Sequence, residues 1–128
     1  MNLLPDDLRA RLLANGAAEP EIDHVPVLKL FNPLGPARWL ITELMEDEDT
    51  LFGLCDLGLG CPELGYVSLA EITAVRLPMG LGIERDLYFE SRLPLSAWAE
   101  AARRTGSILD AELLFRQLAR DASNGGGS

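Results

Sequence analysis

The sequence lacks positive charge over a long internal stretch, since no Lys or Arg occurs from Trp39 to Val75. The 128 residues include 20 acids and 11 bases, for a net charge of −9. Residues 1–95 hold 16 acids and 7 bases and so carry the whole excess, while residues 96–128 are balanced with 4 of each. Because proteins bind phosphates through Lys and Arg, direct nucleic-acid binding is disfavoured. A basic protein partner suits such a surface, although acidic surfaces also serve solubility.

Long apolar runs, a secretory signal with a basic front and internal repeats are also missing. We therefore expect no membrane span and a cytoplasmic location. The length predicts a single domain that needs neither metal nor disulfide to fold. Cysteine is scarce: Cys55 and Cys61 could pair with each other, but reduced thiols are the expectation in a cytosolic protein.

Alternating apolar residues predict strands over residues 24–31, 38–44, 50–55, 66–67 and 83–90. Pro26 marks the first as an edge strand or a strand start. In the second strand, Trp39, Ile41 and Glu43 are expected on one face, with Leu40, Thr42 and Leu44 on the other. The four consecutive acids Glu46, Asp47, Glu48 and Asp49 cannot lie in a core. Residues 39–55 therefore predict a hairpin with an acidic turn.

Helices are predicted over residues 4–15, 68–76, 94–105 and 107–122. Ser68 and Glu71 have the spacing of a capping box, Gly106 is a stop signal, and Ser107 begins the last helix. The predicted fold is α+β: an antiparallel sheet of about four strands with short helices, and two C-terminal helices packed alongside. Trp39 and Trp98 are expected in the core. Residues 1–122 would form the domain, and 123–128 a disordered tail or an added linker.

Three motifs occur in a fixed order. The first combines Thr42–Glu43 with Glu48–Leu54, the second combines Glu63–Glu71 with Val75–Arg76, and the third is Gly80–Phe89. Together they resemble the bacterial family known as domain of unknown function 2958. The resemblance covers about residues 24–90 and leaves out the two C-terminal helices. It implies a small α+β protein common on plasmids, phages and integrated elements. That family has no established activity, so the resemblance supplies no catalytic residue.

Metal and covalent chemistry have few supporting patterns. The acidic turn offers oxygen ligands for Ca²⁺ or Mg²⁺ but lacks the spacing of an EF-hand. His24, Cys55 and Cys61 could form a three-ligand zinc site, or His24 could activate either thiol, although neither spacing matches a known motif. Acidic side chains in an exposed turn lack the burial that raises a pKa for acid–base catalysis. The two Gly-Leu-Gly segments lack the ending of a phosphate loop. No catalytic residue, metal or cofactor is assigned.

The segment Glu84-Arg85-Asp86 is a second polar feature. A structural role is favoured, in which Arg85 forms an ion pair with a semi-buried carboxylate such as Glu43 or Glu71.

The favoured functional hypothesis is a non-enzymatic interaction protein of a mobile genetic element. Its acidic surface would act as a DNA mimic on the basic groove of a host defence nuclease, by anti-restriction or anti-CRISPR action. The partner would be a protein, with no direct contact to nucleic acid or membrane. The alternatives are a small metal- or thiol-dependent enzyme and an element-maintenance protein of unknown partner. The predicted partner-binding residues are Glu43, Glu46, Asp47, Glu48, Asp49, Asp56, Glu63 and Glu71.

Overall fold

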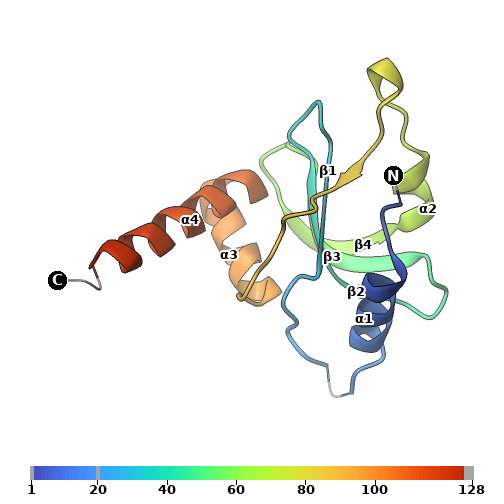
Figure 1. Ribbon diagram of the computed structural model, residues 1–128, viewed down its shortest axis with the longest axis horizontal. Coiled ribbons are helices and arrows are strands. Elements are labelled where there is room, and N and C mark those ends of the chain that lie inside the picture. Colours follow the sequence, from blue (N-terminus) through green and yellow to red (C-terminus); the bar gives the residue numbers. More distant parts are fainter. Residues whose placement is uncertain (1, 20, 126–128) are drawn as a thin grey trace.

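A central antiparallel sheet lies between two layers of helices in the computed structural model, which describes residues 2–19 and 21–125 (Figure 1). The sheet has five strands in the order β4-β3-β2-β1-β5. The strands are β1 (Leu28–Phe31), β2 (Arg38–Leu44), β3 (Thr50–Asp56), β4 (Glu63–Ser68) and β5 (Glu84–Arg85). The helices are α1 (Asp6–Gly16), α2 (Leu69–Ala74), the 3₁₀ turn η1 (Pro78–Gly80), α3 (Leu95–Thr105) and α4 (Ile108–Gly125). The predicted α+β class with two C-terminal helices is confirmed.

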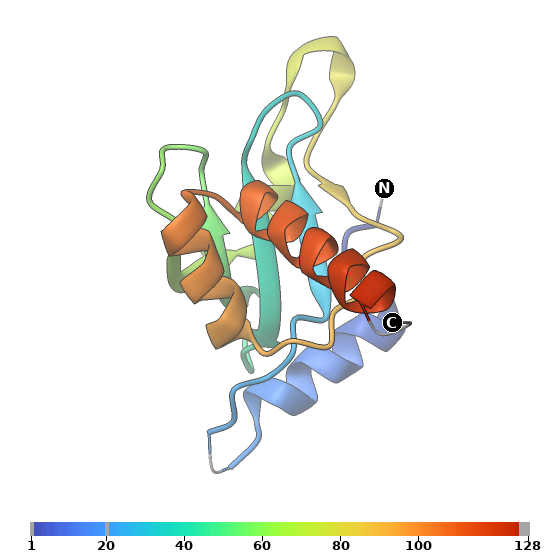
Figure 2. The ribbon, with the colours of Figure 1, turned by 90° about the vertical axis from the view of Figure 1, so that its left-hand side faces the viewer.

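Each face of the sheet buries its own apolar cluster. The cluster that includes Trp39, Ile41 and Leu51 packs against Leu12 of α1 and Ile72 of α2. The other cluster joins Leu40 and Leu54 to residues of α3 and α4, including Trp98. Figure 2 shows α3 and α4 in front of the sheet and α1 below them. Trp39 and Trp98 are 8% and 4% exposed, so both tryptophans lie in the core as predicted.

A β-bulge in β2 changes which side chains face which layer. Ile41 lies opposite Gly53 and Glu43 lies opposite Phe52, so Thr42 is the extra residue. The prediction that Glu43 shares a face with Ile41 is therefore wrong, and Leu44 instead joins Ile41 in the α1 cluster. Gly53 is required here because a Cβ on it would lie 2.0 Å from the carbonyl oxygen of Leu40.

The strand predicted over residues 83–90 is reduced to two residues. Asp86 still donates its backbone N–H to the Lys29 carbonyl at 3.0 Å. Its side-chain oxygen Oδ1 then accepts a hydrogen bond from the N–H of Tyr88 at 2.9 Å, which forms a turn and ends the strand. The alternation of apolar and polar residues in the sequence therefore extends beyond the two residues that pair with β1. β4 differs in the opposite direction: it is longer than predicted, because β3 supplies partners along six residues.

The helix ends follow the predicted caps closely. The Ser68 hydroxyl oxygen accepts a hydrogen bond from the N–H of Glu71 at the start of α2. The Ser107 hydroxyl oxygen does the same for the N–H of Asp110 at the start of α4. Gly106 ends α3 in the left-handed conformation, with φ of 98°. Helix α4 continues to Gly125, three residues past its predicted end. The remainder of the predicted tail, residues 126–128, lies outside the described residues.

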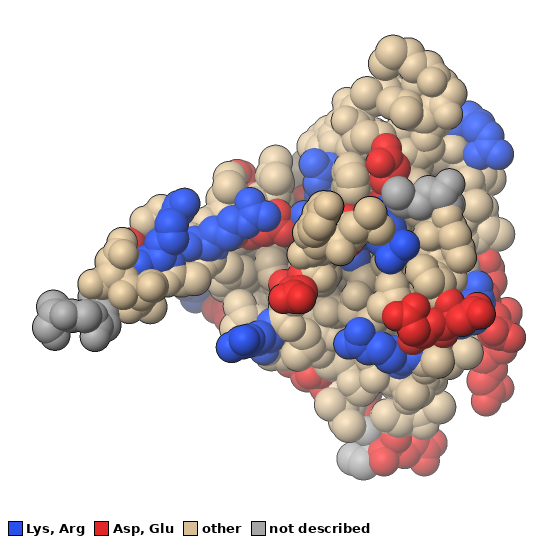
Figure 3. Space-filling view, viewed as in Figure 1, with Lys and Arg blue, Asp and Glu red and all other residues tan. Residues whose placement is uncertain are grey.

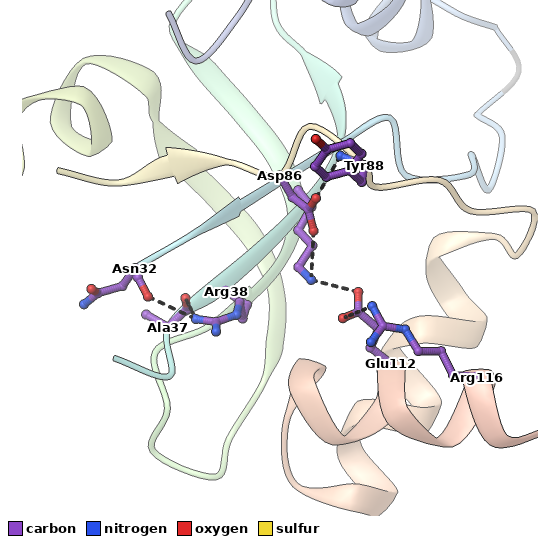
Figure 4. A network of polar contacts seen from close by, with 8 residues as sticks. Asn32, Ala37, Arg38, Asp86, Tyr88, Glu112 and Arg116 are labelled. Carbon is purple, nitrogen blue, oxygen red and sulfur yellow. Dashed lines mark hydrogen bonds and ion pairs between the residues drawn. The ribbon is translucent and has the colours of Figure 1, made fainter. Parts of the chain in front are cut away.

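A buried lysine connects the sheet to α4. Lys29 of β1 is 6% exposed and points toward the face that α4 covers. Its Nζ donates a hydrogen bond to Oε2 of Glu112 on α4 at 2.8 Å and lies 3.4 Å from Oδ2 of Asp86. The other oxygen of Glu112 accepts a hydrogen bond from Arg116 at 3.2 Å. Figure 4 shows Asp86, Glu112 and Arg116 around this point. One cation thus holds together three separate segments.

We expect Lys29→Met to lower the free energy of unfolding by about 2–4 kcal/mol, because Glu112 and Asp86 would lose their buried counter-charge. Urea denaturation measures the change. The double variant Lys29→Met/Glu112→Leu should recover part of the loss, since it removes a buried charge from each side. Arg104→Met is the control, because it breaks the exposed pair with Glu100 and should cost at most about 0.5 kcal/mol. An equal effect of the two single variants would contradict the buried role of Lys29.

Candidate functional site

The turn between β2 and β3, which we call the acidic turn, comprises Glu46, Asp47, Glu48 and Asp49. Asp47 organises it. Its Oδ1 accepts hydrogen bonds from the N–H groups of Asp49 and Thr50 at 2.9 and 2.8 Å, and its Oδ2 accepts one from the Thr50 hydroxyl at 2.6 Å. The bonds from Thr50, and the smaller one from Asp49, lower the pKa of this carboxyl below its ordinary value. The carboxylate of Asp47 is thus both exposed and held in one orientation.

Asp49 connects the acidic turn to α2. Its Oδ2 accepts a hydrogen bond from the Ser68 hydroxyl at 2.7 Å, and its Oδ1 accepts one from the N–H of Ala70 at 2.8 Å. Its backbone carbonyl also accepts the N–H of Leu69 at 2.9 Å. An acid beside the first N–H groups of a helix satisfies donors that have no partner within the helix. These bonds bring Glu71, in the first turn of α2, next to the acidic turn.

Glu48 occupies the left-handed backbone region, with φ of 55°. Glycine or asparagine is favoured there, and a glutamate is strained by about 1 kcal/mol or more. Its side chain lies 3.5 Å from Arg9 of α1, in a pair that is partly exposed to solvent. A pair of this kind contributes little to stability. The chain therefore keeps a charged residue at a position where an uncharged glycine would be more stable.

Four exposed acids, from the acidic turn and the start of α2, lie near one another. Glu46, Asp47, Glu48 and Glu71 are all exposed, and the bonds of Asp49 hold the two segments together. Figure 3 shows one group of acidic side chains in red at the lower right, with other acidic side chains in red at the bottom, near the middle and beside α4. The acidic turn and Glu71 therefore form one local group among exposed acids that also lie elsewhere.

Three of the predicted partner-binding acids do not belong to this group, namely Glu43, Asp56 and Glu63. Glu63 is exposed but lies at the far end of β4, opposite Cys55. Five residues separate it from Ser68, which is about 17 Å along a strand. Asp56 is fully buried. Its Oδ1 accepts the N–H of Gly58 and its Oδ2 accepts the N–H of Ile108, both at 2.8 Å. The structure therefore corrects the surface position predicted for Asp56, which instead holds the start of α4.

We expect Asp56→Ala to lower the free energy of unfolding by about 2–3 kcal/mol, because two N–H groups lose their acceptor, one of them buried. Thermal and urea denaturation measure the loss. Asp110→Ala is the matched control: this aspartate is exposed in the first turn of the same helix and should contribute at most about 1 kcal/mol. If Asp56→Ala cost no more than its control, Asp56 would not be a structural cap.

The bulge places Glu43 in a hollow of about 320 Å³ beside the start of α3. His24, Phe52, Leu64 and Leu95 also line this hollow. Burial raises the pKa of the Glu43 carboxyl, the charge of Glu21 raises it further, and His24 acts in the opposite direction. Asp23, at the rim, accepts hydrogen bonds from the backbone N–H and the hydroxyl of Ser96. Glu43 is thus separated from the acidic turn and is partly withdrawn from solvent.

The pKa of Glu43 predicts a pH-dependent stability change. Because the folded state raises this pKa, the ionised carboxylate destabilises the fold above it, and this cost disappears as the pH falls below about 4.5. Glu43→Gln should therefore raise the melting temperature at pH 7.5 by on the order of 1–2 °C and change it little at pH 4. Thermal unfolding at both pH values measures the effect. Glu90→Gln, at an exposed position, should change neither value; a gain for Glu43→Gln at both pH values would contradict the stated cause.

The ion pair predicted between Arg85 and Glu43 is incompatible with the strand register. Arg85 lies opposite Leu30, and Leu30 lies opposite Trp39. Glu43 therefore lies on β2, two strands away from Arg85, and four residues beyond Trp39. This places the two Cα atoms about 16 Å apart. The other predicted partner, Glu71, lies on α2 beside the acidic turn. Within the segment Glu84–Asp86, the structure gives an ion-pairing role to Asp86, through Lys29. The sequence did not predict that Lys29 pairs with Asp86 and Glu112. A single lysine in an apolar strand has no neighbouring residues that would indicate an ion pair.

The cysteines and the histidine do not converge. Cys55 packs against the α1 cluster, while His24 lines the hollow near α3 on the other face. Cys61 is exposed in the loop before β4. Burial raises the pKa of the Cys55 thiol to about 11, so it is protonated at neutral pH. Among residues 2–19 and 21–125, no group of three or more His, Cys, Asp or Glu side chains is placed to hold a metal ion. None of the helices in these residues is long and apolar enough to cross a bilayer.

The protein is thus a small α+β domain in which several acidic side chains hold the backbone in place. A family model described as a protein of unknown function, DUF2958, matches residues 3–109. The chain belongs to this family. The match is broader than the three motifs, because it includes α1 and α3 and ends within the first turn of α4. No curated protein and no solved structure matches the chain.

Proposed function

We propose that this protein is a non-enzymatic interaction protein whose acidic turn, together with Glu71, docks on the basic nucleic-acid-binding surface of a partner protein. The observation that carries the proposal is the grouping of four exposed carboxylates, on the acidic turn and at the start of α2, on segments that contain no Lys or Arg. Carboxylates on a rigid turn can occupy positions that phosphates would take, with little conformational entropy lost on binding. The hydrogen bonds of Asp47 and Asp49 supply this rigidity.

The backbone of Glu48 supports the same function. A glutamate in the left-handed region costs stability relative to glycine, and solubility alone would be served as well by a charge at an unstrained position. A residue that is kept at an energetic cost is expected where it contributes to binding.

The partner class that suits this surface best is a host defence nuclease complex, which the protein would inhibit by an anti-restriction or anti-CRISPR mechanism. Such complexes bind DNA or RNA through basic grooves, so an acidic protein competes for the same site. The occurrence on mobile elements that the family resemblance implies makes these complexes a plausible target. An element-maintenance protein with another basic partner is the competing assignment, and the choice of partner separates the two.

The experiment is a competition assay in which the protein displaces a fluorescent DNA duplex from purified restriction and CRISPR effector complexes. The triple variant Glu46→Gln/Glu48→Gln/Glu71→Gln removes three charges and leaves Asp47 and Asp49 to hold the turn. It should bind on the order of 10- to 100-fold more weakly, and wild-type affinity should fall steeply with added salt.

The matched control is Glu19→Gln/Glu90→Gln/Glu100→Gln, which removes three exposed charges elsewhere and should bind as the wild type does. Equal losses in the two triple variants would indicate net charge rather than a docking site. Failure to displace DNA from any of these complexes, or affinity that is independent of salt, would contradict the proposal.

A further inference from the structure

The outer side of β4 is an open edge of the sheet. In the order β4-β3-β2-β1-β5, strand β4 has a neighbour on one side among the described residues. It pairs with β3 without a register shift over six residues, from Glu63 to Ser68. The opposite edge is protected, because β5 has two residues and Asp86 turns the chain immediately afterwards. Exposed edges usually carry Lys, Pro or a bulge that prevents pairing, and the six residues of β4 include neither Lys nor Pro.

The alternation of hydrogen bonds shows which backbone groups point outward. Leu69 donates its N–H to the carbonyl of Asp49, which makes that pair a hydrogen-bonded one. In an antiparallel ladder such pairs recur every second residue, so Val67, Gly65 and Glu63 bond toward β3. On the other side of β3, Met45 donates its N–H to the carbonyl of Thr50. Thr50, Phe52 and Leu54 of β3 therefore bond toward β2, and the residues between them bond toward β4. The N–H and C=O groups of Leu64 and Tyr66 therefore point away from the sheet.

The side chains at these two positions are also exposed. Leu64 is 41% and Tyr66 is 66% exposed. Tyr66 packs its ring against Phe52, with 5.0 Å between the centroids, and Leu64 borders the hollow that contains Glu43. Between them, Gly65 has open space where a side chain would be, since no atom lies within 4 Å of an added Cβ. The edge thus offers backbone donors and acceptors, apolar side chains and room for a neighbouring strand.

The charges around β4 determine what kind of strand can pair there. Glu63 is exposed at one end of β4, and Glu71 with the acidic turn lies at the other. In a symmetric antiparallel pair of two copies centred on Gly65, Glu63 would lie opposite Val67 of the second copy, one residue from the Ser68 whose hydroxyl bonds to Asp49. Like charges that are brought close together across a strand pair destabilise it, and each copy carries a net charge of −9. Self-pairing is therefore disfavoured, and a basic segment is favoured.

We infer that β4 binds an extended, basic segment of a partner protein by strand addition, through the outward backbone groups of Leu64 and Tyr66. Apolar residues near the middle of the segment contact Leu64, Tyr66 and Phe52, and basic residues at its ends lie near Glu63 and Glu71. This site is independent of the proposed function: the acidic turn can bind a folded basic groove whether or not β4 binds a strand.

The test uses amide exchange of the full ¹⁵N-labelled protein with three synthetic peptides of eight residues. One alternates Arg and Val, the second has the sequence Arg-Arg-Pro-Pro-Arg-Arg-Pro-Pro, and the third alternates Glu and Val. The Arg–Pro peptide has the same charge as the first, but each pair of adjacent prolines removes N–H donors from both sides of the strand, so it cannot extend a sheet. The amides of Leu64 and Tyr66 should exchange rapidly in the free protein. The Arg–Val peptide should slow them by about tenfold or more, and the other two should not.

Two variants complete the test. Leu64→Pro removes an outward N–H and leaves the bonds to β3, so it should fold and lose the protection by the Arg–Val peptide. Leu64→Lys keeps the backbone and should weaken the protection by placing a cation at the basic segment's site. Slow exchange of both amides in the free protein, equal protection by the Arg–Pro peptide, or dimerisation through β4 in sedimentation would each overturn the inference. The competition assay with nuclease complexes can succeed or fail separately from these results.

Discussion

The buried ammonium group of Lys29 is the constraint on which the arrangement of the C-terminal half depends. A charge that is removed from water needs opposite charges within a few ångströms, and Lys29 finds them on two segments distant in sequence. Glu112 belongs to α4, and Asp86 follows β5. Together with Asp56, which accepts the N–H of Ile108, this interaction determines where α4 begins and how it lies against the sheet. The family match ends at residue 109, so most of the helix that these contacts position lies beyond the matched region.

The acidic residues of this chain divide into two groups with different physical roles. Asp47, Asp49 and Asp56 accept backbone N–H groups, and Asp86 pairs with Lys29. Glu46, Glu48, Glu63 and Glu71 extend into solvent or lie at its edge. Aspartate has the shorter side chain and can reach its neighbouring backbone, which explains why it dominates the first group. Most aspartates of the first group direct their carboxylates toward their own fold, so the longer glutamates are better candidates for contact with a partner.

The acidic turn and the open edge of β4 are two neighbouring surfaces with different chemistry. They meet where Asp49 accepts the Ser68 hydroxyl at the end of β4. The turn presents charge on a backbone fixed by its own hydrogen bonds, which favours fast, salt-sensitive association. The edge presents backbone groups beside exposed apolar side chains, which favours a contact that depends on strand geometry. Both surfaces lie within the residues that the family model matches, whereas α4 largely does not.

Local patterns in the sequence determined the element types, the caps at Ser68, Gly106 and Ser107, the acidic turn and the α+β class, because each depends on residues close together in the chain. The tertiary structure alone decided three further points. The bulge at Thr42 moved Glu43 to the other face, because β2 carries one residue more than β3 at that point. Asp56 became buried because α4, 52 residues later, supplied an N–H to its carboxylate. Lys29 was paired by Glu112, 83 residues away. Contacts between residues so far apart leave no periodic pattern in the sequence. Their energy depends on how deeply the two groups are buried and on where the fold places the second group, and the local order of residues determines neither.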